Sequence, residues 1–187
     1  MAEIRPLSDV DEPLLRRLIM GYSSTEVYRV AREETPDTIR FELRLARLEQ
    51  PLVKRYPLDA AELTRYRDLA HMGHVFGAFE DEVRSGIAIC DPQLWNRSLI
   101  VQELDVAPDV QRSGIGRQLM ATVEQHARTL GMRMIVCETQ NSNVPAIRFY
   151  RALGFTVDGI DVSLYTNDDL ACDAVALFLK KRLSDTL

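Results

Sequence analysis

The sequence has no long uninterrupted apolar run, and it lacks the features of an exported protein. No apolar stretch approaches the ~20 residues that a membrane-spanning helix requires, so we expect no membrane partner. The first residues of the chain lack the basic start and the long apolar segment of a secretory signal peptide. We therefore expect the protein to be cytoplasmic.

Cysteine and histidine are both scarce. The cysteines Cys90, Cys137 and Cys172 are odd in number, far apart and without a CxxC spacing, so neither a disulfide framework nor a zinc site is indicated. Cys90 and Cys137 lie within apolar segments, which favours buried core positions over reactive thiols. The histidines are equally scattered: His71, His74 and His126. Because they lack ligand spacing, we expect surface or core histidines and no metal.

Basic residues are not in excess. The chain of 187 residues carries 23 Lys and Arg against 28 Asp and Glu, a net charge of −5. This balance argues against a nucleic-acid partner, because phosphates attract basic patches. The length is sufficient to bury a core, and no repeat, low-complexity tract or linker interrupts the chain. The sequence therefore predicts a single domain over residues 1–187.

Hydrophobic periodicity predicts mostly strands in the first half of the chain. Residues 4–7 suggest a short strand, and Ser8 with the following acidic residues precedes a helical apolar run. In residues 38–48 apolar and charged positions alternate, which predicts a half-buried strand. Asp59 opens a second expected helix. Three further strands are expected with short antiparallel connections, at residues 74–79, 83–90 and 98–106.

From Gly114 onward, helices and strands alternate. Ile115, Leu119, Val123 and Leu130 share one helical face, and Gly131 follows as a terminating glycine. The next expected helix begins at Asn143, a capping residue, with a proline in its first turn. Strands are expected at residues 133–138, 155–157, 162–165 and 175–180. The order predicts an α/β fold, a mixed sheet with helices on both faces and a central βαβ unit.

The segment 104–117 connects an expected strand to an expected helix and has the features of an anion-binding site. Gly114 and Gly116 allow the backbone to approach a ligand closely, and the first N–H groups of a helix have no intrahelical partner. Together with the helix dipole, these groups favour a phosphate or pyrophosphate. Two familiar phosphate loops do not fit. The segment lacks Gly-Lys-Ser/Thr, and Leu119 stands where the dinucleotide motif has its third glycine.

Two motifs resemble those of the GNAT superfamily of N-acetyltransferases. The spacing Gln111-x-x-Gly114-x-Gly116 after a strand is similar to the superfamily's acetyl-CoA pyrophosphate loop. A second signature follows the next strand and reads Asn143-x-x-Ala146-x-x-Phe149-Tyr150-x-x-Leu153-Gly154-Phe155. The resemblance implies the GNAT fold with a mostly antiparallel mixed central sheet, acetyl-CoA as cosubstrate and acetyl transfer to an amine.

A narrower resemblance covers roughly the C-terminal half of the chain. Segments such as Trp95-Asn96-Arg97 and Leu164-Tyr165-x-Asn167 are similar to those of streptothricin acetyltransferases. This likeness implies a primary amine of a small molecule, most simply streptothricin, as acceptor. A protein N-acetyltransferase acting on N-termini or lysines remains an alternative, and a non-catalytic acyl-CoA-binding module is a more distant one. Dimers are common in the superfamily, which leaves a homodimer open.

The resemblance also implies roles for individual residues. Backbone groups of Leu104 and Val106 would hold the pantetheine arm. The expected cofactor-binding residues beyond them are Gln111, Arg112, Ser113, Gly114, Ile115, Gly116, Arg117, Asn143, Ala146 and Phe149. Arg112 and Arg117 could equally be surface residues, and Asn143 could serve only as a helix cap.

Tyr150 matches the tyrosine that the superfamily places near the acetyl sulfur, so it is the candidate general acid. The alternative is a core residue, since it lies on the apolar face of its helix. Glu103 is the candidate base, with Glu138 or no dedicated base as alternatives. Candidate acceptor-binding residues are Asp105, Glu138, Asp161 and Tyr165. Any of these carboxylates could instead be solvated or ion-paired.

Overall fold

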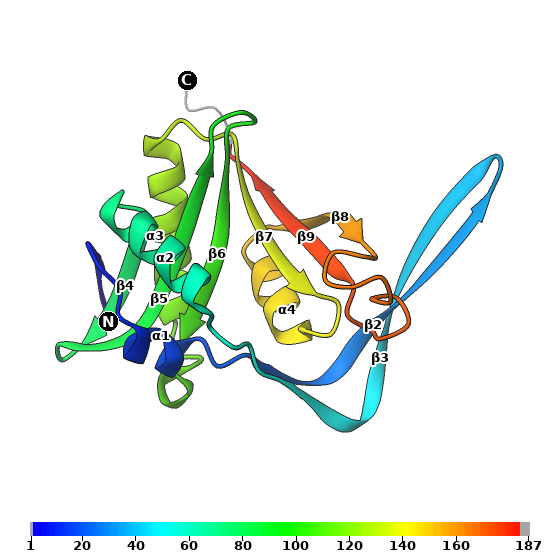
Figure 1. Cartoon of the computed structure of the whole chain (residues 1–187), viewed down its shortest axis with the longest axis horizontal. Helices are drawn as coiled ribbons and strands as arrows, with labels where there is room; N and C mark the ends of the chain where they lie inside the picture. The colour runs from blue at the N-terminus through cyan, green and yellow to red at the C-terminus, as the bar shows by residue number, and fades with distance from the viewer. Residues whose placement is uncertain (1, 184–187) are drawn as a thin grey trace. The chain divides into compact units, whose positions relative to one another are not determined.

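The computed structural model describes residues 2–183, which fall into two compact units. The first unit comprises residues 2–20, 56–137 and 182–183, and the second comprises residues 21–55 and 138–181. Figure 1 shows the chain coloured from its N-terminus to its C-terminus. The expectation of a single domain over residues 1–187 stays a prediction.

A mixed sheet forms the centre of the first unit. Its strand order is β1 (Glu3–Pro6), β4 (Val75–Glu80), β5 (Val83–Gln93), β6 (Ser98–Val106) and the start of β7 (Met134–Gln140). The first three neighbouring pairs are antiparallel, whereas β6 and β7 run parallel. All five strands were expected from the sequence, and a parallel pair joined through a helix is the predicted βαβ unit.

Three helices belong to this unit, and their ends follow the local sequence. α1 (Glu12–Leu18) begins after Asp11, whose carboxylate accepts the Leu14 N–H group. α2 (Ala60–His71) has a capping box, in which Asp59 and Glu62 each accept the other's backbone N–H group. α3 (Ile115–Thr129) is followed by Gly131 with a φ of 67°, as the glycine signal predicts. The 3-10 helix η1 (Pro108–Val110) precedes α3.

Helices cover both faces of this sheet, as expected. On one face, α1 and α2 bury Leu15 and Leu69 in a cluster that includes Ile87 and Ile89 of β5. On the other face lies α3, because a Cβ atom added at Gly86 would come within 3.2 Å of Leu119. Figure 1 shows α2 and α3 on opposite sides of β4 and β5. Cys90 is fully buried, in agreement with its expected core position.

The second unit contains the end of β7, α4 (Val144–Ala152), β8 (Thr156–Asp161) and most of β9 (Ala176–Arg182), with strand order β7-β9-β8. It also contains a two-stranded ribbon of β2 (Tyr22–Thr35) and β3 (Thr38–Lys54). The base of the ribbon is anchored by two hydrogen bonds with Asn141. Its backbone carbonyl accepts the Tyr28 N–H group, and its side-chain amide donates to the Tyr28 carbonyl.

Two sequence-based predictions about the second unit are wrong. Residues 162–165 form bends and no strand, because the Asp169 carboxylate accepts the backbone N–H groups of Tyr165 and Thr166 that a strand ladder would use. Residues 38–48 do form a strand, but it is not half-buried. Ile39 is 64% exposed, since β3 pairs with β2 alone in the two-stranded sheet.

Within residues 2–183, none of the helices has both the length and the apolar character that a membrane crossing needs.

Candidate active site

Two carboxylates lie next to each other on β6 in the first unit. Glu103 pairs with Ile89 of β5, and Asp105 pairs with Ile87, so the two acidic side chains share a face with two fully buried isoleucines. A register shift precedes them, which leaves Gln102 without a partner position on β5. Such bulges redirect the side chains that follow. The β6 face therefore carries two acids at the edge of the apolar core under α1 and α2.

Hydrogen bonds organise this carboxyl pair. The Tyr66 hydroxyl donates to Oε1 of Glu103 over 2.6 Å, and the Tyr66 ring is buried in the same core. Burial, the charge of Glu103 and a hydrogen bond with Glu103 raise the pKa of Asp105 well above its ordinary value. Burial and the nearby Glu103 also raise the pKa of Tyr66. The raised pKa favours a proton on Asp105 beside Glu103, whose carboxylate also accepts the hydrogen bond from Tyr66.

The segment between β6 and α3 has the conformation expected for an anion-binding loop. Gly114 is the N-terminal cap of α3 with a left-handed φ of 97°, and no side chain caps this helix end. The first intrahelical hydrogen bond runs from the Gln118 N–H group to the Gly114 carbonyl. The N–H groups of residues 115–117 precede that bond, and they lie at the positive end of the helix dipole.

The side chains of this loop leave its backbone accessible. Gln111 donates to the Val106 carbonyl over 3.1 Å, and the Ser113 hydroxyl donates to the Val110 carbonyl over 2.7 Å. A Cβ atom added at Gly114 would meet nothing within 4 Å, so the chain has open space beside the glycine. Arg112 and Arg117 are exposed. These features fit a pyrophosphate held mainly by backbone groups.

The second signature lies on α4 in the second unit. The Asn143 side chain accepts the Ala146 N–H group at the start of the helix and donates to the Thr139 hydroxyl over 3.0 Å. Its role as a helix cap is therefore confirmed. Tyr150 is 8% exposed and its ring lies against Phe149 and Phe155, with centroids 5.4 and 5.5 Å away. The ring of Tyr150 is thus buried on the apolar face of its helix, as the alternative of a core residue requires, and its role as a general acid stays a prediction.

A second tyrosine–carboxyl pair lies in the same unit. The Tyr165 hydroxyl donates to Oε1 of Glu138, and burial raises the pKa of Glu138 although this hydrogen bond acts in the opposite direction. Two of the expected acceptor-binding residues are thus in contact. Asp161 accepts the Ser163 N–H group over 2.9 Å at the end of β8. The binding of an acceptor by these residues stays a prediction.

Comparison with known proteins identifies the family of this chain. Residues 35–155 match the profile of the acetyltransferase (GNAT) family. The chain belongs to the GNAT family. It is an N-acetyltransferase that uses acetyl-CoA as its cosubstrate. The expected GNAT fold is confirmed.

Several relatives of this GNAT chain are similar over most of their length. A streptothricin acetyltransferase of Streptomyces lavendulae is 31% identical over 166 residues, which cover 87% of this chain and 86% of the relative. The crystal structure of nourseothricin acetyltransferase superimposes with a TM-score of 0.75 at 29% identity, covering 97% of this chain and 98% of that one. A GNAT family acetyltransferase from Elizabethkingia anophelis, solved with acetyl-CoA bound, shares the fold with a TM-score of 0.57 at 19% identity over 67% of this chain and 84% of that one.

Sequence reasoning missed two relationships that depend on the tertiary structure. Tyr66 was assigned no role, although its spacing from Leu63 and Leu69 on α2 would have marked the buried face of that helix. His74 and His126 also come together, with Nδ1 and Nε2 3.0 Å apart, and burial lowers the pKa of both. Within residues 2–183, no three His, Cys, Asp or Glu side chains are grouped closely enough to hold a metal ion.

Proposed function

We propose that this GNAT enzyme transfers the acetyl group of acetyl-CoA to a primary amine of a small molecule of the streptothricin class. The observation that carries the proposal is the identity of 31% to a streptothricin acetyltransferase over 87% of this chain. An alignment of 166 residues includes most of the N-terminal half, which usually shapes the acceptor site in this superfamily. The similarity to nourseothricin acetyltransferase over nearly the whole chain supports the same substrate class.

The proposed reaction requires the acceptor amine to lose a proton before it attacks. An alkylamine has a pKa of about 10, so it is mainly protonated at neutral pH. We assign the acceptance of this proton to Glu103, because a protonated Asp105 beside it leaves Glu103 as the ionised member of the pair. The hydrogen bond from Tyr66 orients the Glu103 carboxylate. A negative charge at this position also attracts a cationic acceptor.

In the transfer step the amine nitrogen forms a bond to the acetyl carbon as the carbon–sulfur bond breaks. Tyr150 is assigned the donation of a proton to the departing sulfur, so the proton lost by the phenol neutralises the thiolate. The backbone of the loop from Gln111 to Arg117 is assigned the pyrophosphate, and the backbone of Leu104 and Val106 the pantetheine arm. The accessible N–H groups at the start of α3 support this assignment.

The assignment of acceptor-binding residues rests on the second unit. Glu138 and Asp161 are carboxylates that suit a polycationic amine, and Tyr165 holds Glu138 by a hydrogen bond. Glu138→Gln keeps the shape of the side chain and the hydrogen-bonding partner of Tyr165, but it removes the charge. We expect this variant to raise KM for the acceptor with a smaller effect on kcat, because it weakens binding rather than chemistry.

Mass spectrometry of the acceptor after incubation with the protein and acetyl-CoA tests the proposal. The panel contains streptothricin, polyamines, aminoglycosides and peptides with free N-termini or lysines. We expect a single acetyl group on streptothricin, formed with a kcat/KM well above that of any other amine. Acetylation of peptides alone would replace the small-molecule proposal with protein acetylation. Binding of acetyl-CoA without acetylation of any amine would show that the chain is not an active acetyltransferase.

A further inference from the structure

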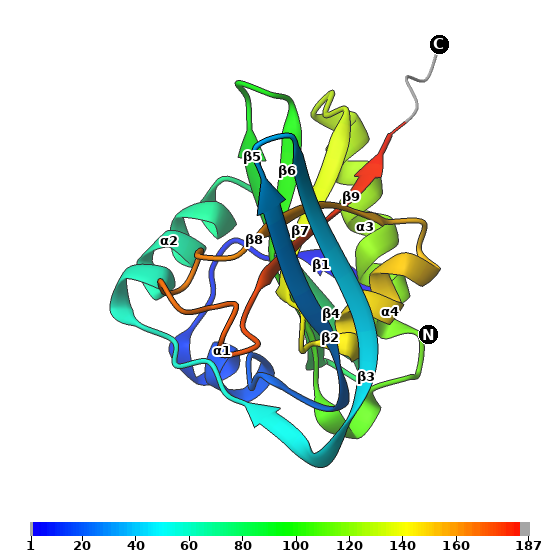
Figure 2. The ribbon, with the colours of Figure 1, turned by 90° about the vertical axis from the view of Figure 1, so that its right-hand side faces the viewer.

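The segment between β8 and β9 has no regular structure and a single buried residue in its exposed part. Residues 162–175 form bends, turns and irregular backbone, which Figures 1 and 2 show in orange. Every residue from 163 to 172 is exposed except Asp169, which has no exposed surface. Because few apolar contacts hold such a segment, its conformation depends on the polar contacts that it makes.

The buried carboxylate of Asp169 organises this segment. Its Oδ2 accepts the Tyr165 N–H group over 2.8 Å, and its Oδ1 accepts the N–H group and the hydroxyl of Thr166 over 2.8 and 2.7 Å. The Asp169 carbonyl also accepts the Ala174 N–H group. Burial alone would raise the pKa of Asp169, but the hydrogen bonds from Thr166 and Tyr165 and the charge of Lys54 hold it below its ordinary value. Asp169 is therefore a buried carboxylate in its ionised form.

Tyr165 is held both at its backbone and at its hydroxyl. Asp169 binds the backbone N–H group, and the hydroxyl donates to Oε1 of Glu138 on β7. Glu138 lies on a strand of the sheet, whereas Tyr165 is 41% exposed in the irregular segment. The place of the hydroxyl beside Glu138 thus depends on the conformation that Asp169 gives to the segment.

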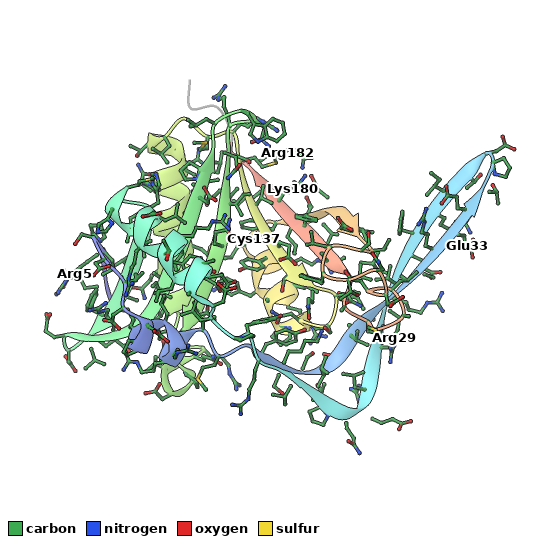
Figure 3. All side chains as sticks on the ribbon, viewed as in Figure 1. Arg5, Arg29, Glu33, Cys137, Lys180 and Arg182 are labelled. Atoms are coloured by element: carbon green, nitrogen blue, oxygen red, sulfur yellow. The ribbon has the colours of Figure 1, made fainter. Side chains whose placement is uncertain are left out.

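The ribbon of β2 and β3 supplies cations to two acids of the same segment. The Arg29 guanidinium pairs with the Asp173 carboxylate, and Figure 3 shows Arg29 on the part of the ribbon next to the loops that follow β8. Burial lowers the pKa of Lys54 at the end of β3, and the charge of Asp169 acts in the opposite direction. Gly21 permits this end of the ribbon to close, because a Cβ atom there would collide with the Lys54 carbonyl oxygen.

We propose that Asp169 is a positioning residue for the acceptor amine: it places the Tyr165 hydroxyl, which in turn orients the Glu138 carboxylate. This inference rests on the proposed function, in which Glu138 binds a cationic acceptor. A hydrogen bond to Oε1 fixes the plane of the carboxylate, so that Oε2 is presented to the amine in one orientation. Because Asp169 has no exposed surface, its effect reaches the acceptor only through Tyr165.

Asp169→Asn tests this role, with Asp168→Asn as the matched control. An asparagine has one acceptor oxygen, so its NH2 group faces one of the N–H donors that Asp169 binds. We expect KM for streptothricin to rise by at least ~10-fold, and kcat and KM for acetyl-CoA to change by less than about twofold. Asp168 is exposed, and its replacement removes the same charge from the same segment. An equal rise in KM in both variants would reduce the effect to charge and overturn the positioning role.

A double-mutant cycle with Tyr165→Phe shows whether the effect passes through Tyr165. This variant removes the hydroxyl that reaches Glu138 and keeps the ring and the backbone N–H group. In a Tyr165→Phe chain, Asp169→Asn should raise KM for the acceptor by less than about twofold, because the contact that Asp169 positions is already lost. If the two changes multiply in full, Asp169 acts by another route and the proposal is wrong.

Hydrogen exchange gives a readout that does not depend on catalysis. The backbone N–H groups of Tyr165 and Thr166 belong to exposed residues but are bonded to Asp169. We expect both to exchange slowly in the wild type and in Asp168→Asn, and at least ~10-fold faster in Asp169→Asn. Rapid exchange in the wild type would overturn the proposal. If melting curves show that Asp169→Asn is unfolded, Thr166→Val, which removes one of the three hydrogen bonds, replaces it with a smaller expected rise in KM.

The kinetics of the wild type separate a failure of this inference from a failure of the proposed function. A wild type that acetylates streptothricin, with a KM that Asp169→Asn leaves unchanged, would overturn the positioning role alone. A wild type that acetylates another amine would overturn the proposed substrate, and the KM ratios are then measured with that amine. A wild type that acetylates no amine would overturn both.

Discussion

The Tyr66 hydroxyl of α2 donates a 2.6 Å hydrogen bond to Oε1 of Glu103 on β6. The two residues are 37 positions apart in the chain, and the capping box at Asp59 defines where the helix that carries Tyr66 begins. Because the Tyr66 ring is buried in the core, its hydroxyl is held in one place. The hydrogen bond ties the orientation of the proposed base to the packing of α2.

We expect Tyr66→Phe to lower kcat/KM by about 10-fold, since a hydrogen bond to a charged group contributes roughly 1.5–3 kcal/mol. A hydrogen bond to a carboxylate favours its ionised form, so its loss should move the acidic limb of the kcat/KM profile to higher pH. Steady-state kinetics from pH 5 to pH 9 measure both effects. Glu103→Gln, as the control, should lose ~100-fold or more in kcat/KM, the loss expected when a general base is removed. If Tyr66→Phe lowers kcat/KM but leaves the acidic limb of the pH profile where it is, Tyr66 has a purely structural role.

The raised pKa of Asp105 predicts how stability depends on pH. A carboxyl group whose pKa is raised in the folded state contributes stability below its unfolded pKa, and this contribution is lost as the pH rises through the folded value. Asp105→Asn removes the titration but keeps an N–H donor for Glu103. We expect the variant to match the wild type at pH 4 and to unfold at a higher temperature than the wild type at pH 8. Calorimetric or circular-dichroism melts at the two pH values measure these unfolding temperatures. A difference between variant and wild type that is the same at pH 4 and pH 8 would contradict a raised pKa for Asp105.

Gly114 allows the conformational and electrostatic parts of the loop to be separated. With a φ of 97°, an alanine here would carry a backbone strain of about 1–2 kcal/mol but would meet no neighbouring atom. We expect Gly114→Ala to lower the melting temperature and Gly114→Asp to add a loss of at least ~10-fold in acetyl-CoA affinity, because a carboxylate would repel the pyrophosphate. Isothermal titration calorimetry with acetyl-CoA measures the second effect. Equal affinities in the two variants would argue against a pyrophosphate at this loop.

Tyr150→Phe tests the proposed general acid while keeping the aromatic packing. The ring contacts with Phe149 and Phe155 need no hydroxyl, so the variant should fold normally. We expect kcat to fall by ~100-fold and the acetyl-CoA dissociation constant to change by less than about twofold, as befits the loss of acid catalysis alone. Pre-steady-state kinetics with a fixed acceptor measure the chemical step. An unchanged rate would restrict Tyr150 to the core.

Local patterns in the sequence determined most of the elements and the position of the glycine-containing loop to which we assign the pyrophosphate. The capping box of Asp59 and Glu62, the apolar face of α3 and the strand alternation are all encoded within a few residues of each other. The same is true of Gly114, because its left-handed φ of 97° is a backbone conformation that glycine adopts without steric cost. These features were predictable because helix and strand periods repeat within a single element.

Only the tertiary structure decided which side chains meet and which apolar faces are covered. Tyr66 with Glu103, Glu138 with Tyr165 and His74 with His126 are pairs from distant segments, brought together by the packing of different elements. The alternation in β3 predicted a strand with a buried face, but a pattern cannot say what buries it. In this chain Ile39, Phe41 and Leu45 of β3 stay exposed, because the sequence period defines the two faces of a strand and only neighbouring elements decide whether a face is buried.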